Sequence, residues 1–234
     1  MLKQVRLNLF YLYKTSIRSI LLFWFIYLLF IGALLVLTTI IGGGMQFIGV
    51  NVIPSFIFTI IFSIFFFKDT FPFLIKYGTN RHSYLISLVI FTLLYAVGMT
   101  ILSHLVTNII AQVVKLFQIE NFIFLGMDES FEIPVTIMEV FIFEALLYAL
   151  LFLLCSCITV VFFRFGYLLG AICIAPFIAM FFFPEVVEKL VGLGKLLALG
   201  YEEYHIGVYF ILYAIFSLII WLLIRNASIL DQTK

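Results

Sequence analysis

The segment KDTFPFLIKYGTNRHSYLISLV, residues 68–89, interrupts an apolar chain with a proline, a glycine and several cations. Around it, 65% of the 234 residues are hydrophobic and only 11% are charged. A soluble domain has about half apolar and a quarter charged residues. A core of this size cannot bury so much apolar surface, so the composition indicates that lipid surrounds most of the chain.

The segment also carries the signals of a short helix in a polar turn. Thr70 is a suitable N-cap, and Pro72 has the fixed φ of a first helical turn. Gly78 favours the left-handed conformation that ends a helix, and Thr79 or Asn80 can cap the next one. These signals predict a short amphipathic helix over residues 72–77. A helix this short needs a membrane surface or a protein groove to hold it.

Six apolar runs approach the roughly 20 residues that a helix needs to cross a bilayer. The runs do not alternate as the strands of a β-barrel do. We therefore expect an all-α polytopic membrane protein, a single transmembrane domain over residues 1–234 with six spans. The expected spans are Ile20–Ile41, Val52–Phe67, Tyr84–Ile110, Val135–Phe163, Tyr167–Pro184 and Ile206–Ile224.

The lysines and arginines predict how these spans are oriented. With the N-terminus in the cytoplasm, ten cations lie inside: Lys3, Arg6, Lys14, Arg18, Lys68, Lys76, Arg81, Arg164, Arg225 and Lys234. Only three lie outside: Lys115, Lys189 and Lys195. Because cytoplasmic loops are enriched in Lys and Arg, both termini are predicted to be cytoplasmic.

Two further segments are predicted to lie along the membrane rather than across it. In residues 1–19, four cations fall within an arc of about 120° on a helix, which predicts an interfacial amphipathic helix. The alternative for this segment is a basic flank that only sets topology. Between the last two spans, residues 185–205 have apolar residues at helical spacing broken by glycines. We expect a broken helical segment there, dipping into the outer leaflet or capping the structure.

The run FLIKYGTNRHSYLISLV, residues 73–89, resembles the first cytoplasmic loop of ABC-2-type exporter permeases of Gram-positive bacteria. The family pattern is an apolar short helix, Gly, Ser or Thr, one further residue, a basic residue, and an aromatic that opens the third span. It maps here onto Leu74, Gly78, Thr79, Arg81 and Tyr84. In that family this helix is the coupling helix, seated in a cleft of the ATPase subunit. The alternative is a loop whose cations only obey the positive-inside rule.

The resemblance implies which residues contact the ATPase: Phe73, Leu74, Lys76, Tyr77, Gly78, Thr79 and Arg81. It also implies a location in the bacterial plasma membrane and a dimer with a second permease copy or a paralogue. Size and the 30 phenylalanines most resemble the half-size permeases of staphylococcal exporters for phenol-soluble modulins, which are amphipathic cytolytic peptides. The implied function is peptide export.

The chain itself carries no signature of an ATPase or of a bound cofactor. There is no G-x-x-x-x-G-K-[ST] segment, so ATP and Mg²⁺ are expected in a partner subunit. No two histidines are three or four residues apart, and no catalytic residue, metal site or nucleic-acid partner is predicted. Besides the ATPase, the expected partners are membrane lipid and the amphipathic peptide substrate.

Ionisable residues within the spans are candidates for a transport path or gate. His104 lies near the outer end of the third predicted span, and Glu139 and Glu144 lie near the outer end of the fourth. The two glutamates are about 140° apart on a helix, so one of them at most shares a face with His104. A His104–Glu144 or a His104–Glu139 pair is reasonable. The alternative role is a satisfied interhelical pair that aids packing.

Two other functions compete with export. One is a membrane scaffold or immunity protein that binds peptides without pumping them. The other is an intramembrane protease, because His104 and Asn108 match an H-x-x-x-N pattern of one protease class. That class also needs the motif EE-x-x-x-R, and Glu202–Glu203 has no arginine at that position. We therefore expect no enzyme activity in the chain itself.

Overall fold

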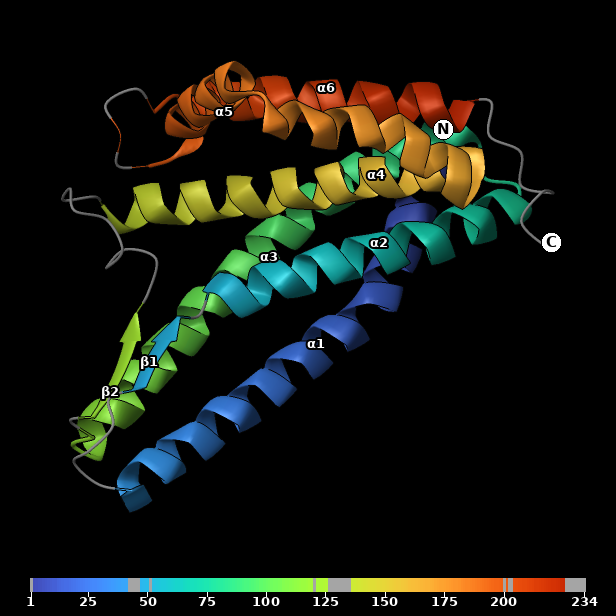
Figure 1. Cartoon of the computed structure of the whole chain (residues 1–234). Helices are drawn as coiled ribbons and strands as arrows, with labels where there is room; N and C mark the ends of the chain where they lie inside the picture. The colour runs from blue at the N-terminus through green and yellow to red at the C-terminus, as the bar shows by residue number, and fades with distance from the viewer. Residues whose placement is uncertain are drawn as a thin grey trace.

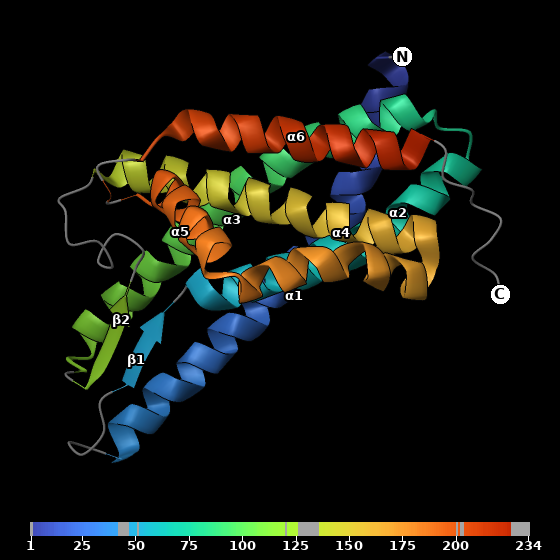
Figure 2. The same ribbon diagram turned by 45° about the horizontal axis from the view of Figure 1, so that its top comes forward.

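The computed structural model describes residues 2–41, 47–50, 52–119, 121–125, 136–199, 201 and 204–225. The elements in chain order are α1 (Leu2–Ile41), β1 (Phe47–Val50), α2 (Val52–Lys76), α3 (Arg81–Leu116), β2 (Phe122–Leu125), α4 (Ile137–Ala179), η2 (Met180–Phe182), α5 (Pro184–Leu197) and α6 (Ile206–Arg225). Figures 1 and 2 show α4 and α6 side by side, whereas α1 and α3 cross them obliquely.

Five helices of the described residues are long and apolar enough to cross a membrane: Leu2–Ile40, Val52–Lys76, Arg81–Leu116, Ile137–Phe182 and Ile206–Arg225. Large apolar side chains such as Leu22, Phe65 and Leu94 are more than half exposed on the outside of these helices. A water-facing surface rarely carries so many of them, whereas lipid favours them. The predicted class, an all-α multi-pass membrane protein, is confirmed at this level.

The helix labelled α4 consists of two arms that meet at Gly166. The backbone there has φ 77° and ψ 175°, a conformation essentially restricted to glycine. Figure 1 shows the chain doubling back at this point, so that the second arm returns along the first. A Cβ atom on Gly170 would lie 2.6 Å from the ring of Phe162, which only glycine avoids. The elbow falls between the predicted spans Val135–Phe163 and Tyr167–Pro184, although Val135 lies outside the described residues.

The sequence predicted a separate interfacial helix at the N-terminus, but the structure does not have one. Residues 2–41 form one uninterrupted helix of 40 residues, about 60 Å long at 1.5 Å per residue. Its first half contacts α3, where Ser87 Oγ donates to the Val5 carbonyl at 3.4 Å. Leu2 to Ile31 contain no proline and no glycine, so nothing in the backbone breaks the helix between the predicted segments.

The predicted short helix over residues 72–77 is also absent as a separate element, because α2 continues through Pro72 to Lys76. Thr70 is not an N-cap but lies inside the helix, where its hydroxyl donates to the Phe66 carbonyl at 2.7 Å. Proline in a helix removes a hydrogen bond to the residue four positions before it, here Lys68. Lys68 and Asp69 are exposed, so water can satisfy that carbonyl.

A parallel pair of short strands, which the sequence analysis did not predict, joins the segments after α1 and α3. Phe47 to Val50 pair in register with Phe122 to Leu125. Figure 1 shows this pair beside the far end of α3, away from α4 and α6. An isolated two-stranded sheet is only marginally stable, and Phe122 is accordingly buried.

Helices α2, α3 and α4 pack around an aromatic core. Phe62, Phe66, Phe91, Tyr95 and Phe152 are buried together, with ring centroids between 4.6 and 6.2 Å apart. Aromatic pairs at these separations stabilise a core beyond their buried area. Of the phenylalanines near the end of the predicted second span, Phe62, Phe66 and Phe67 are buried in the bundle, and Phe65 is exposed.

The segment before α6 also differs from the sequence prediction. Gly192 and Gly194 do not break it, and α5 is one helix from Pro184 to Leu197. It carries no buried residue, and Figure 2 shows it running obliquely between the second α4 arm and the start of α6. The C-terminal end of α5 is held by Tyr209 of α6, whose hydroxyl donates to the Leu197 carbonyl at 2.7 Å.

Candidate functional site

The turn between α2 and α3 is closed by backbone geometry that the sequence predicted. Gly78 has φ 84°, and its N–H donates to the Ile75 carbonyl at 3.0 Å. The Thr79 N–H donates to the Leu74 carbonyl at 3.0 Å, which completes a Schellman motif. Asn80 then caps α3 by accepting from the His82 N–H. The prediction of Gly78 as helix terminator is confirmed, and of the two predicted caps the structure selects Asn80.

The first turns of α1 hold this turn from one side. Gln4 Nε2 donates to the Gly78 carbonyl at 3.1 Å, and Thr79 Oγ1 donates to Asn8 Oδ1 at 3.1 Å. One turn further along α1, the ring of Tyr11 stacks on Phe73 with 4.7 Å between centroids. The segment that needed a groove to hold it is thus supported by the chain's own N-terminal helix.

The seven residues implied by the family resemblance divide into two groups. Leu74 and Thr79 are buried within the chain, and Arg81 is turned toward α6. Phe73, Lys76, Tyr77 and Gly78 are exposed, and 74% of the surface of Tyr77 is accessible against 39% for Phe73. A partner that docks here can reach the exposed group directly, whereas the buried group shapes the turn.

Two arginines bind the C-terminal carbonyls of α6. Arg81 Nη1 donates to the Ile224 carbonyl at 3.1 Å and also to the Arg225 carbonyl. Arg164, two residues before the α4 elbow, donates to the Leu222 and Leu223 carbonyls at 3.2 and 3.1 Å. The last four carbonyls of a helix have no partner within it and carry its negative dipole end. These two guanidinium groups satisfy all four and connect the start of α3 and the end of the first α4 arm to the end of α6.

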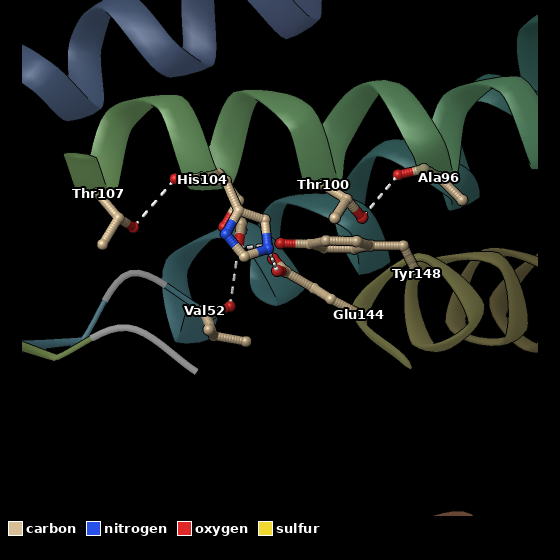
Figure 3. Close-up of polar contacts among 9 residues, drawn as sticks. Val52, Ala96, Thr100, His104, Thr107, Glu144 and Tyr148 are labelled. Atoms are coloured by element: carbon tan, nitrogen blue, oxygen red, sulfur yellow. Dashed lines mark hydrogen bonds and ion pairs between the residues drawn. The ribbon is translucent and has the colours of Figure 1, made fainter. Parts of the chain in front are cut away.

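A second polar site lies deeper in the bundle, between α3 and α4. Of the two pairs that the sequence allowed, the structure forms His104–Glu144, with Nε2 3.1 Å from Oε2. Figure 3 shows the imidazole and the carboxylate facing each other, with Tyr148 one turn along α4 from Glu144. Glu144 is 1% exposed and the His104 side chain 28%, so the pair can be reached from the histidine side.

The other glutamate candidate does not join this site. Glu139 is exposed at the first turn of α4 and forms a capping box with Thr136. Its Oε2 accepts from the Thr136 N–H at 2.8 Å and from the Thr136 hydroxyl at 2.9 Å. Glu139 therefore starts the helix, a role that the sequence pattern T-x-x-E could have revealed.

A row of hydroxyl groups along α2, which was not predicted from the sequence, meets three buried tyrosines. Ser55 contacts the Tyr148 hydroxyl at 2.6 Å and Thr59 contacts the Tyr95 hydroxyl at 3.0 Å. Thr70 contacts the Tyr84 hydroxyl at 3.1 Å. Polar pairs of this kind join helices in lipid, where no water competes for the hydroxyl groups. Four-residue spacing of Ser and Thr on an apolar helix was the available signal.

Among the described residues, no group of three or more His, Cys, Asp or Glu side chains could hold a metal ion. The described cysteines are free, two of them buried and Cys173 exposed. The candidate sites are therefore the hydrogen bonds that join the α2–α3 turn to α1 and α6, and the His104–Glu144 pair. No protein-family model matches the chain, and it matches neither a curated protein nor a solved structure.

Proposed function

We propose that the chain is the transmembrane permease subunit of an ATP-driven exporter. In this proposal a separate ATPase subunit supplies the energy, and the cargo is a hydrophobic or amphipathic peptide. The observation that carries it is the turn between α2 and α3. Its exposed Lys76 and Tyr77 stand at the end of the bundle, while its backbone and Arg81 contact α1 and α6.

These contacts support a lever. A force applied at Tyr77 reaches α1 through Gln4 and Asn8, and it reaches α6 through Arg81. Because Arg164 binds the same helix end, the α4 elbow moves with it. An ATPase that binds one arrangement of this junction more tightly than the other would shift the spans between two states.

In this proposal the two arms of α4 are separate spans, which makes six, and both termini lie on the cytoplasmic side of a bacterial plasma membrane. Six spans make half of a transporter in this class, so the proposal includes a second copy or a paralogue. The His104–Glu144 pair is the proposed gate, because a buried acid in lipid is costly unless it is paired. Breaking the pair would remove this polar contact between α3 and α4 on the proposed path of the peptide.

Affinity purification from the native membrane, followed by mass spectrometry, tests the proposed partner. An ATP-binding subunit should copurify with the wild type and be lost with Lys76→Glu or Tyr77→Ala. Tyr201→Ala is the matched control, since Tyr201 is also exposed but lies in the segment before α6. Retention of the ATPase by both tyrosine variants would show that the α2–α3 turn is not its docking site.

Uptake of an amphipathic peptide into inverted membrane vesicles tests the proposed activity. Transport should need ATP and should fall with Tyr77→Ala while Tyr201→Ala transports normally. Protection of cells against the peptide that persists when the partner cannot hydrolyse ATP would favour a non-pumping immunity protein and would overturn the export proposal.

A further inference from the structure

Helices α1 and α3 run parallel and leave an apolar groove between them. They meet where Ser87 contacts Val5, and the groove then follows both helices from Leu9 and Phe91 to Ile20 and Leu102. The first and last lining residues of the two helices keep the 82-residue offset of Val5 and Ser87, as expected of helices that run parallel. The walls are almost entirely apolar. The hydroxyl of Ser16 donates to the Leu12 carbonyl within α1. The groove therefore favours a hydrocarbon ligand.

The dimensions of the groove restrict the shape of that ligand. Its volume is about 300 Å³, and Leu9 to Ile20 span about 16 Å at 1.5 Å per residue. An α-helix is about 10 Å in diameter and would fill much more than this volume over the same length, whereas an extended hydrocarbon chain is far thinner. These dimensions favour one extended hydrocarbon chain over a helical peptide.

The rim of the groove on α1 carries positive charge. Arg6 and Lys14 are exposed and lie about 20° and 60° from Ile17 of the groove wall, at 100° per residue. Residues 2–41 contain no aspartate or glutamate. Within the described part of the chain, neither cation has a carboxylate within 4 Å. Cations beside hydrocarbon are costly unless an anion pairs with them, so the rim favours an anionic head group.

We propose that this α1–α3 groove binds an anionic phospholipid of the surrounding bilayer. One acyl chain lies between Leu9 and Ile20, and the phosphate is bound by Arg6 at the end of the groove nearer the N-terminus. Lys14, about 12 Å further along α1, adds positive charge to the rim. A guanidinium group can bind phosphate oxygens through two parallel hydrogen bonds, which makes Arg6 the stronger of the two contacts. This site is independent of the export proposal, because it needs neither an ATPase nor a peptide.

Native mass spectrometry of the full chain, delipidated in detergent, tests the site. Phosphatidylglycerol and phosphatidylcholine with the same acyl chains are added separately, and bound lipid is counted over a range of concentrations. One phosphatidylglycerol should bind about tenfold or more tightly than phosphatidylcholine, since each basic residue near the head group contributes to binding an anionic lipid. Glycerol phosphate alone, which lacks the chains, should not bind.

Two pairs of variants separate the groove and its rim from general lipid contact. A Cβ on Gly98 or on Gly32 meets no atom within 4 Å, but only Gly98 lines the groove. Gly98→Trp should therefore abolish tight binding while Gly32→Trp retains it. Arg6→Gln with Lys14→Gln should remove the preference for phosphatidylglycerol, whereas Lys115→Gln, an exposed cation outside the groove, should not. Thermal unfolding in detergent confirms that each variant is folded.

Three outcomes would overturn the proposal. Equal binding of both lipids, unchanged by Gly98→Trp in folded protein, would mean ordinary bilayer contact. Loss of binding in both tryptophan variants, each folded, would mean that the groove is not the site. Binding of an acidic amphipathic peptide that Gly98→Trp abolishes, with no tight binding of phosphatidylglycerol, would assign the groove to a peptide.

Discussion

Replacing Arg164 by methionine should loosen the end of α6 without disturbing the rest of the bundle. The guanidinium donates to the exposed Leu222 carbonyl at 3.2 Å and to the half-buried Leu223 carbonyl at 3.1 Å. Water replaces the first contact at little cost. The second is a hydrogen bond to a charged donor, whose net contribution is about 1.5–3 kcal/mol when fully buried and less here. We expect a loss of about 1–2 kcal/mol in the free energy of unfolding.

Unfolding by SDS in mixed micelles measures this loss, and hydrogen exchange locates it. The amides of the last turn of α6 should exchange faster in Arg164→Met, because that turn frays when its carbonyls lose their partners. Arg164→Lys should recover part of the stability, since an ammonium group reaches one carbonyl but cannot bridge two. Lys115→Met, which removes an exposed cation at the end of α3, is the control for lost charge.

Substitutions of Arg164 and Arg81 should not be additive in their effect on stability. Because both bind neighbouring carbonyls of one helix end, fraying caused by the first substitution weakens the contact that the second removes. The double variant should therefore lose less stability than the sum of the single variants. Arg164→Met that unfolds like the wild type, with unchanged exchange in α6, would refute a stabilising role of these contacts.

Three further substitutions test other parts of the structure by thermal unfolding in detergent. Gly166→Ala places a Cβ on a backbone with φ 77°, so it should lower the free energy of unfolding by about 1–3 kcal/mol. Gly207→Ala, on an open helix surface, should be neutral, and equal effects of the two substitutions would contradict the role of Gly166 at the elbow. Glu144→Gln should cost about 1–3 kcal/mol and exceed Glu139→Gln, which removes only an exposed cap; the reverse order would contradict the buried pair. Tyr148→Phe should cost under about 1 kcal/mol, because Ser55 keeps the Val52 carbonyl as its acceptor; a larger loss would mean that the phenol has a greater role.

Local signals predicted those features that depend on neighbouring residues. Apolar runs close to the length of a bilayer crossing identified the helices, and Gly78 with Asn80 identified the turn between α2 and α3. The side-chain spacing allowed His104 to meet either Glu144 or Glu139. The choice needed three dimensions, because it depends on which face of α4 packs on α3.

Features that depend on distant packing could not be predicted in this way. Pro72 signals the start of a helix, yet Phe71 is fully buried and in ring contact with Tyr84, and this packing holds α2 together through the proline. The strands β1 and β2 are four residues each, too short for a periodic pattern. The contacts of Arg81 with α6 link positions 144 residues apart, so no local pattern could reveal them.

The parallel strands have a consequence for how α1 and α3 can separate. The two helices are fastened at one end by Val5 and Ser87, and the segments that follow them are fastened by the pairing of β1 with β2. Because the space between them is closed at both ends, it can widen only in its middle. A molecule that enters between these helices must therefore come laterally from the lipid, and not along the helices from the water on either side.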